Sequence, residues 1–285
     1  MVKDNNMKLV TMTSELEKRF GIKKALQMIK KAGFDGYDFT MTSEKDQNLF
    51  GDNYVEYVKG IKAEADRLNL PCLQSHSPCP LMRTKEQIMP LVDVFKRSID
   101  ICAILDCKIL VVHPGSFLSA EENKEFYDKF LPYAKEKGIM IATENMFKWK
   151  DETETETVPS ACGTADDFVR HMEVIKHPNF TACMDVGHAE MVNCEGAPKI
   201  IRALGDKIGC LHVHDNDKFD DWHTLPFTGK INWEEVCKAL KEIDYKGHFT
   251  YEADSFLRKF PDELMEACLN LMEKTGRYLI NRIQK

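Results

Sequence analysis

Several common sequence signals are missing from this chain of 285 residues. No apolar run reaches the roughly 18 residues that a membrane-spanning helix needs, and the N-terminus lacks the charged, apolar and small-residue succession of a signal peptide. We therefore expect a cytoplasmic protein with no membrane partner. Neither a GxGxxG turn nor a P-loop is present, which disfavours a nucleotide-binding open sheet.

Cysteine pairs and basic stretches are missing as well. The ten cysteines include no CxxC pair and most fall within apolar segments, which favours reduced core thiols over disulfides or a zinc ribbon. The net charge is −7, from 39 basic and 46 acidic residues, and no Lys/Arg-rich stretch follows a predicted strand. A field of this sign does not attract nucleic acid, which is therefore not an expected partner.

What the chain does contain is a strict alternation of strand and helix patterns. Strands are predicted at residues 7–13, 34–41, 71–77, 108–113, 139–145, 180–186, 208–214 and 248–253. Helices are predicted at residues 14–31, 54–70, 86–105, 120–137, 165–176, 198–204, 233–243 and 261–283. Eight such units favour an α/β protein whose residues 1–285 form a single (β/α)8 TIM barrel, with a doubly wound open sheet as the alternative.

Six of the predicted strands run into side chains that bind metals or move protons. These side chains are His76, His113, Glu144, Asp185 with His188 three residues on, His212 and Glu252. Burying such a group at the end of an apolar strand is costly unless something pairs with it. Because a barrel of this type gathers its active site where the strands end, the series predicts that these side chains converge on a shared cation.

Short motifs accompany these strand ends. They are VHPGS at 112–116, TEN at 143–145, DVGH at 185–188, HVHD at 212–215, DWHTLP at 221–226 and GKINW at 229–233. Together they resemble the xylose-isomerase-like barrels, a superfamily that includes sugar and sugar-phosphate isomerases and epimerases, inositol-catabolism enzymes and endonuclease IV. The resemblance extends roughly from His76 to Glu252.

The isomerase and epimerase members of this superfamily imply one divalent metal ion, Mn²⁺, Zn²⁺, Co²⁺ or Mg²⁺, held by Glu144, Asp185, His212 and Glu252. The resemblance also makes Glu144 and Glu252 the acid/base groups, which would move a proton next to a substrate carbonyl through a metal-stabilised enediolate. The expected activity is that of a metal-dependent isomerase or epimerase, with a small carbohydrate or sugar phosphate as substrate. The plainer interpretation is that Glu144 and Glu252 are only salt-bridged barrel carboxylates.

Further residues are candidates for a second metal ion or for substrate binding. They are His76, His113, His188, His214, Lys218, Asp221 and His223. His188 could also be an ordinary loop histidine, and His214 could support the metal site instead of facing the substrate. Phosphate in such barrels binds after strands seven and eight, where Lys218, Lys230 and Arg258 fall, so a phosphorylated sugar stays open. Phe147 and Trp149 could stack on a sugar ring, or serve in a lid or an interface.

Three alternatives to the isomerase remain. Five of these further candidates (His76, His113, His188, Asp221 and His223) join the four expected metal ligands in a set that resembles the nine zinc ligands of endonuclease IV. That resemblance implies a phosphodiesterase acting on abasic DNA, but the negative net charge and the acidic run at residues 151–156 argue against DNA. A metal-dependent dehydratase of a cyclitol or keto sugar is the second alternative, and a non-catalytic binding barrel is the third. The amphipathic last helix is compatible with a homo-oligomer.

Overall fold

Eight short parallel strands form one curved sheet at the centre of the molecule. The computed structural model describes residues 7–79, 84–150, 156–191 and 193–285. The strands are β1 (Leu9–Met12), β2 (Gly36–Thr40), β3 (Cys72–His76), β4 (Ile109–Val111), β5 (Met140–Glu144), β8 (Phe180–Asp185), β9 (Ile208–His212) and β10 (Phe249–Tyr251). Their order in the sheet is β10-β1-β2-β3-β4-β5-β8-β9, so each of these strands lies beside its neighbours in the chain.

The sheet closes between β9 and β10. Val213 and Tyr251 form an isolated parallel bridge. The backbone N–H of Val213 donates to Thr250 O at 2.9 Å, and that of Glu252 donates to Val213 O at 3.1 Å. The predicted barrel is therefore confirmed, and the open-sheet alternative is wrong. Closure brings the C-terminal ends of all eight strands to one rim, which is the end where such barrels carry their sites.

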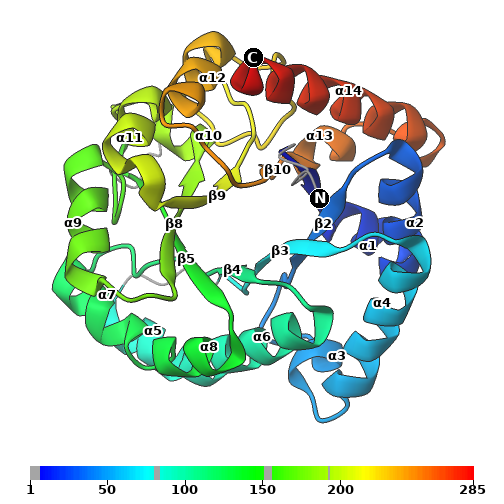
Figure 1. The fold of residues 1–285 in the computed structure, drawn as a ribbon, viewed down its shortest axis with the longest axis horizontal. Helices are drawn as coiled ribbons and strands as arrows, with labels where there is room; N and C mark the ends of the chain where they lie inside the picture. The colour runs from blue at the N-terminus through cyan, green and yellow to red at the C-terminus, as the bar shows by residue number, and fades with distance from the viewer. Residues whose placement is uncertain (1–6, 80–83, 151–155, 192) are drawn as a thin grey trace, which may run out of the picture.

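Helices surround the barrel in a ring (Figure 1). They are α1 (Ser14–Phe20), α2 (Ile22–Ala32), α3 (Gln47–Phe50), α4 (Tyr54–Leu68), α5 (Lys85–Ile88), α6 (Val92–Leu105), α7 (Ala120–Tyr127), α8 (Leu131–Lys137), α9 (Ala165–Ile175), α10 (Val186–Ala189), α11 (Ala197–Leu204), α12 (Trp233–Glu242), α13 (Asp254–Arg258) and α14 (Met265–Gln284). Three 3₁₀ turns cover Met89–Leu91, Gly205–Lys207 and Asp262–Leu264. The last helix, α14, packs between α12 and α2 and completes the ring (Figure 1). None of the described helices is long and apolar enough to cross a membrane.

Two predicted helices are broken by non-helical residues, and a third, over residues 86–105, is interrupted by the 3₁₀ turn Met89–Leu91. The helix expected over residues 14–31 stops at Gly21, whose φ of 75° and ψ of 154° separate α1 from α2. The helix expected over residues 120–137 divides into α7 and α8, with Pro132 in the first turn of α8. Proline has no N–H to donate to the carbonyl four residues earlier, so it fits a first turn and not the middle of one long helix.

A small hairpin was not predicted. Strands β6 (Phe147–Trp149) and β7 (Thr157–Pro159) pair in antiparallel fashion beyond the rim. The sequence pattern around them is polar and irregular, which gave no strand signal. Residues 151–155 of the acidic run lie outside the described residues.

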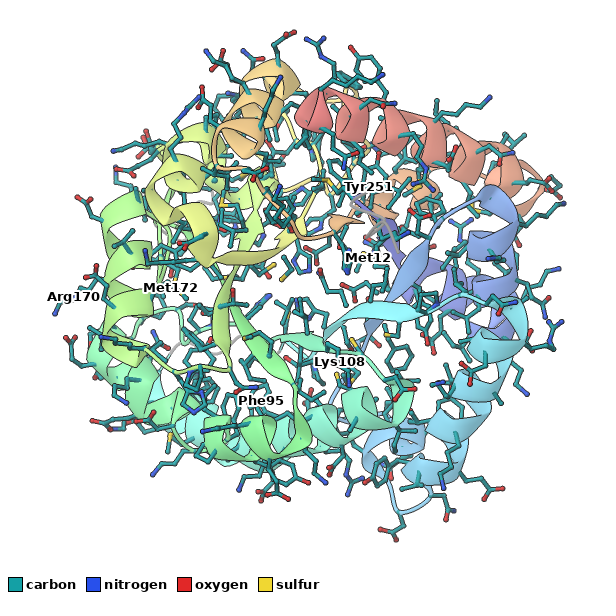
Figure 2. All side chains as sticks on the ribbon, viewed as in Figure 1. Met12, Phe95, Lys108, Arg170, Met172 and Tyr251 are labelled. Carbon is teal, nitrogen blue, oxygen red and sulfur yellow. The ribbon has the colours of Figure 1, made fainter. Side chains whose placement is uncertain are left out.

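Apolar side chains fill the space between the helices and the barrel. Phe95 on α6 is fully buried and packs on Phe126 and Phe130, whereas Arg170 on α9 points away from the barrel (Figure 2). All ten cysteines are free and eight of them are buried, as expected for core thiols. A second cluster, of Val111, Ala142, Cys183 and Cys210, packs together inside the barrel.

Candidate metal centre

Four of the predicted metal ligands meet at the C-terminal rim. Glu144 ends β5, Asp185 ends β8, His212 ends β9 and Glu252 follows β10. Each offers a ligand atom that lies within 4.8 Å of the other three. Three of the residues are fully or almost fully buried, and the side chain of Glu252 is 14% exposed, so the group opens towards the mouth through Glu252.

The spacing within this group suits a cation. His212 Nδ1 lies 3.0 Å from Glu144 Oε2 and 3.0 Å from Glu252 Oε2. Yet no described residue forms a hydrogen bond to any of these three buried atoms. Two ligand atoms that hold one cation at about 2.1 Å and at a right angle lie about 3.0 Å apart, which is the spacing seen here. Buried polar atoms without a hydrogen bond destabilise the fold, and a cation bound among them would remove that cost. The residues present therefore fit a divalent ion.

Asp185 is fixed so that one oxygen remains free. Its Oδ1 accepts a hydrogen bond of 2.6 Å from the backbone N–H of His188 and lies 3.1 Å from His214 Nε2. Its Oδ2 has no hydrogen-bond partner among the described residues. A Cβ at Gly187 would lie 1.9 Å from Cε1 of His214, so the glycine of the DVGH motif is what lets this imidazole pack against the turn.

Charges within the group keep its carboxylates ionised. Burial raises the pKa of Glu144, but the imidazoles of His212 and His113 outweigh burial and hold that pKa well below its usual range. Burial likewise raises the pKa of Glu252, but His212 and His223 together hold it below its usual value. Burial lowers the pKa of His212, but Cys183 and the two glutamates raise it well above its ordinary value. Both glutamates are thus held in the ionised form, which is the form that binds a cation.

A second group stands beside the first. His188, His214, Asp221 and His223 offer ligand atoms within 4.8 Å of one another. Asp221 Oδ2 lies 2.8 Å from His223 Nε2 and 3.3 Å from His188 Nε2. The rings of His214 and His223 stack with centroids 4.0 Å apart. His188 Nδ1 lies 3.2 Å from Glu144 Oε1, which joins the two groups.

His76 and His113 complete the set on the other side of Glu144. Their Nε2 atoms lie 3.0 Å apart, and His113 Nε2 is 3.3 Å from Glu144 Oε2. The ring of His76 stacks on that of His212, with centroids 5.3 Å apart and planes at 19°. The structure therefore brings together all the predicted site residues except Lys218. Lys218 Nζ instead lies 3.0 Å from Glu190 Oε2.

Backbone carbonyls orient three of these histidines. Nδ1 of His76 lies 2.6 Å from Ser77 O, Nδ1 of His188 lies 3.0 Å from Asn145 O, and Nδ1 of His223 lies 3.0 Å from Glu252 O. A carbonyl oxygen can only accept, so Nδ1 carries the hydrogen in each ring. Nε2 then faces the site, as in a metal ligand whose other nitrogen is held by the protein.

Two residues that organise the site lie within the sequence motifs but had no predicted role. Asn145, next to Glu144, forms one hydrogen bond to the backbone carbonyl of Asp185 and accepts one from its backbone N–H. The buried Asp215 carboxylate organises the loop that carries Asp221 and His223. It accepts hydrogen bonds from the backbone N–H of Asn216, Phe227 and Ile231 and from Trp233 Nε1. Their place in the TEN and HVHD motifs was the available signal.

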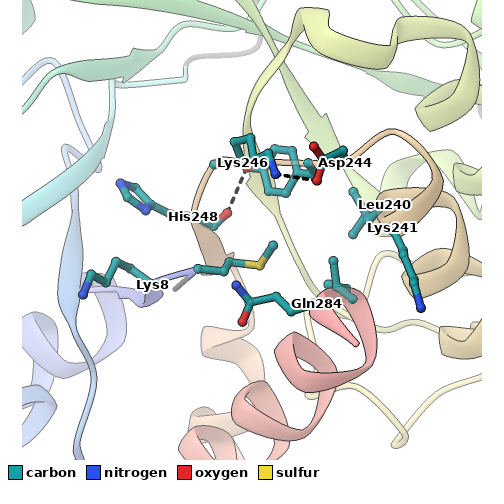
Figure 3. A pocket seen from close by; sticks show the side chains of 11 residues that line it. Lys8, Leu240, Lys241, Asp244, Lys246, His248 and Gln284 are labelled. Carbon is teal, nitrogen blue, oxygen red and sulfur yellow. Dashed lines mark hydrogen bonds and ion pairs between the residues drawn. The ribbon is translucent and has the colours of Figure 1, made fainter. Parts of the chain in front are cut away.

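The other side chains considered for substrate contact lie as follows. Phe147 packs edge-on to His188, with centroids 5.2 Å apart, and Trp149 packs on Phe147. Arg258 pairs with Glu15 and Asp254, and Lys230 lies over the exposed ring of Phe219. A separate pocket of about 820 Å³ lies at the opposite end of the barrel, where Lys8 precedes β1 and His248 precedes β10 (Figure 3). The candidate metal ligands found among the described residues do not line it.

Comparison with known proteins is consistent with this architecture. The chain is similar to the L-ribulose 3-epimerase of Methylomonas sp., with 24% identity over 82% of this chain and 79% of that protein. It is also similar to the fructoselysine 3-epimerase of Shigella flexneri, with 22% identity over 82% of this chain and 86% of that one. Among solved structures, a D-tagatose 3-epimerase-like protein superposes with a TM-score of 0.73 at 20% identity, over 98% of this chain and 100% of that chain. The sequence profile of the xylose isomerase-like TIM barrel family matches residues 26–274, and the chain belongs to that family.

Proposed function

We propose that this protein is a divalent-metal-dependent sugar isomerase or epimerase, and that its reaction is epimerisation next to a ketose carbonyl. The observation that carries this proposal is that Glu144 Oε2 and Glu252 Oε2 both lie 3.0 Å from His212 Nδ1, each without a hydrogen bond from a described residue. Two similar proteins are sugar 3-epimerases, which supports the same class of reaction here.

The cation would be held by Glu144, Asp185, His212 and Glu252. Three carboxylates and one imidazole, with no thiolate, suit Mn²⁺, Mg²⁺, Co²⁺ or Zn²⁺. When bound, such an ion polarises a substrate carbonyl and stabilises the negative charge that develops as the neighbouring proton leaves.

Glu144 and Glu252 would move the protons. The carboxylate of one removes the proton from the carbon next to the carbonyl, so that the C–H electron pair forms a carbon–carbon double bond and the carbonyl electron pair moves to oxygen. The other glutamate must by then have taken a proton from solvent, and as a carboxylic acid it returns that proton to the opposite face of the same carbon, which yields the epimer. Return of the proton to the adjacent carbon would yield the aldose–ketose isomer instead.

The group of His188, His214, Asp221 and His223 would bind the rest of the substrate or a second cation. Its donors lie directly beside Glu144, and Phe147 covers His188 from the side of the β6–β7 hairpin. The aromatic ring offers an apolar surface for the C–H face of a sugar, and the imidazole and carboxylate groups can bind its hydroxyls.

A deuterium experiment tests this function. Ketoses, aldoses and cyclitols would be incubated in D₂O with metal-free protein and with protein given Mn²⁺, Co²⁺, Mg²⁺ or Zn²⁺. We expect deuterium at a carbon next to a carbonyl only when metal is present. Glu144→Gln and Glu252→Gln should each lower epimer formation by about 100-fold or more. Glu15→Gln, at a buried carboxylate paired with Arg19 and Arg258, is the control and should keep turnover. Full turnover in both site variants with metal bound would disprove the assignment.

A metal-dependent phosphodiesterase is the second candidate. One observation favours it: the nine residues that resemble the zinc ligands of endonuclease IV all lie around Glu144 and Asp185. A duplex with an abasic site, tested with Zn²⁺ in parallel, separates the two functions. Cleavage of this duplex, with no deuterium incorporated into any sugar, would favour the phosphodiesterase. Loss of water from a cyclitol or keto sugar would instead indicate a dehydratase.

A further inference from the structure

A buried carboxylate lies inside the barrel next to the candidate metal centre. Asp38 is on β2, is 2% exposed and faces the barrel interior. No hydrogen bond to its Oδ1 comes from the described parts of the chain. No motif marks the first two strands, so no role is predicted for Asp38 from the sequence. Burying a carboxylate in this position lowers the stability of the fold relative to an apolar side chain. We therefore expect Asp38 to have a function.

The imidazole of His212 lies between Asp38 and the two glutamates. Its Nδ1 is 3.0 Å from Glu144 Oε2 and 3.0 Å from Glu252 Oε2, whereas its Nε2 is 3.8 Å from Asp38 Oδ2, within ion-pair range. The two ring nitrogens therefore face opposite ways, one towards the rim and one towards Asp38.

His212 differs in this respect from the histidines around it. In His76, His188 and His223 the hydrogen of Nδ1 is donated to a backbone carbonyl. In His212 it is Nε2, the nitrogen away from the two glutamates, that faces a side-chain carboxylate instead. Gln74, which pairs with Asp38 across β2 and β3, is engaged elsewhere: its Oε1 accepts from Thr250 Oγ1 at 3.0 Å, and its Nε2 donates to Leu211 O at 3.3 Å.

We propose that Asp38 is a positioning residue that holds the hydrogen of His212 on Nε2 and thereby keeps Nδ1 free, and oriented, as a ligand for the cation. A neutral imidazole carries one hydrogen, and a carboxylate charge 3.8 Å from Nε2 favours the form in which Nε2 holds that hydrogen and Nδ1 has the lone pair. A carboxylate in this place also makes the ligand nitrogen more basic, and loss of such a partner typically lowers metal affinity by about 10- to 100-fold. This inference rests on the metal site of the proposed function.

The test compares three proteins by their affinity for Co²⁺, measured by competition with a chelating dye. The proteins are the wild type, Asp38→Asn and the control Thr250→Val. Thr250 is also a buried polar residue of the barrel interior, but its hydroxyl bonds Gln74 and not His212. Asp38→Asn should bind Co²⁺ about 10- to 100-fold more weakly and show altered Co²⁺ absorption bands, because the amide is a neutral and weaker acceptor. Its metal-free form should unfold at the same temperature as the wild type or higher. Thr250→Val should keep wild-type Co²⁺ affinity.

A measurement on the unmutated protein keeps the inference testable if Asp38→Asn does not fold. Long-range ¹H–¹⁵N correlation spectra of the Zn²⁺-loaded wild type should show the ring hydrogen of His212 on Nε2. A hydrogen on Nδ1, wild-type Co²⁺ affinity in Asp38→Asn, or an equal loss of affinity in Thr250→Val would each overturn the proposal. If the wild type binds no divalent ion, the proposed function fails together with this inference. If the wild type binds Co²⁺ and Asp38→Asn binds it equally well, only the role of Asp38 fails.

Discussion

Asn145 and Asp185 are joined by two reciprocal hydrogen bonds. Asn145 Nδ2 donates to Asp185 O at 2.8 Å, and the backbone N–H of Asp185 donates to Asn145 Oδ1 at 2.8 Å. The backbone carbonyl of Asn145 in turn lies 3.0 Å from His188 Nδ1. Because Asn145 follows Glu144, this contact fixes the ends of β5 and β8 relative to each other at the point where two of the candidate ligands stand.

Replacement of Asn145 by leucine should therefore weaken both folding and metal binding. The variant leaves a buried N–H and a buried C=O of Asp185 unsatisfied, which costs about 2–4 kcal/mol of unfolding free energy. Urea unfolding of the metal-free protein measures this loss, and dye competition measures the metal affinity. Asn179→Leu is the control, because Asn179 Nδ2 bonds Ile139 O near the other end of β5. If Asn145→Leu bound metal as tightly as Asn179→Leu, the contact would have no part in placing the ligands.

The loop that carries Asp221 and His223 should depend on Asp215. In Asp215→Asn, the amide NH₂ replaces one of the two oxygens. It would face either the N–H groups of Phe227 and the Trp233 indole or those of Asn216 and Ile231, so part of the hydrogen bonding is lost. We expect a loss of about 3 kcal/mol in unfolding free energy and faster cleavage between residues 216 and 232 in limited proteolysis. An unchanged cleavage rate in that loop would show that the carboxylate does not hold it.

The charged pairs of the site stabilise the metal-free protein over a limited pH range. The pKa of Glu144 is lowered in the folded protein, so its contribution to stability is present above the unfolded value near 4.5 and is lost as pH falls through the folded pKa. The pKa of His212 is raised, so its contribution is present below the unfolded value near 6.5 and is lost as pH rises through the folded pKa. These pairs therefore stabilise the metal-free protein most between about pH 4.5 and 6.5.

Metal binding at His212 must release a proton while that imidazole is protonated, which makes the affinity lower at low pH. The difference in melting temperature between samples with Mn²⁺ and samples with a chelator should therefore grow from about pH 5.5 to about pH 8.5. A difference that stays constant over this interval would mean that no imidazole of raised pKa takes part in binding the ion.

Lys218 should contribute little to turnover of an unphosphorylated sugar. Its ammonium group pairs with Glu190 Oε2 at 3.0 Å, and Glu190 Oε1 accepts a hydrogen bond from the N-terminus of α11. Lys218→Met should therefore change kcat/KM by less than about threefold, as is usual when a partly exposed ion pair is removed. A loss of tenfold or more would place the ammonium group in contact with the substrate.

The barrel could be predicted because the strand and helix patterns are local signals. The convergence of Glu144, Asp185, His212 and Glu252 on one rim follows from their places at strand ends, whereas their role as a set of metal ligands is what the family resemblance implies. An apolar run that ends in Glu144 or His212 predicts a strand. The cost of burying the last side chain predicts that this side chain has a partner. The helix breaks at Gly21 and Pro132 also had local causes, but the helical periodicity on both sides concealed them. Asp38 could not be found in this way: it stands in an ordinary strand pattern, and only the closed barrel brings it to His212. The β6–β7 hairpin likewise depends on contacts that no sequence period reports.

The central claim is that one divalent ion is held by Glu144, Asp185, His212 and Glu252. The most direct test is a crystal structure of the protein grown with Mn²⁺, with anomalous diffraction recorded to locate the metal. We expect an anomalous peak about 2.0–2.6 Å from a carboxylate oxygen of each acidic residue and from His212 Nδ1. A map with no peak among these four side chains, or with a peak only among His188, Asp221 and His223, would contradict the account.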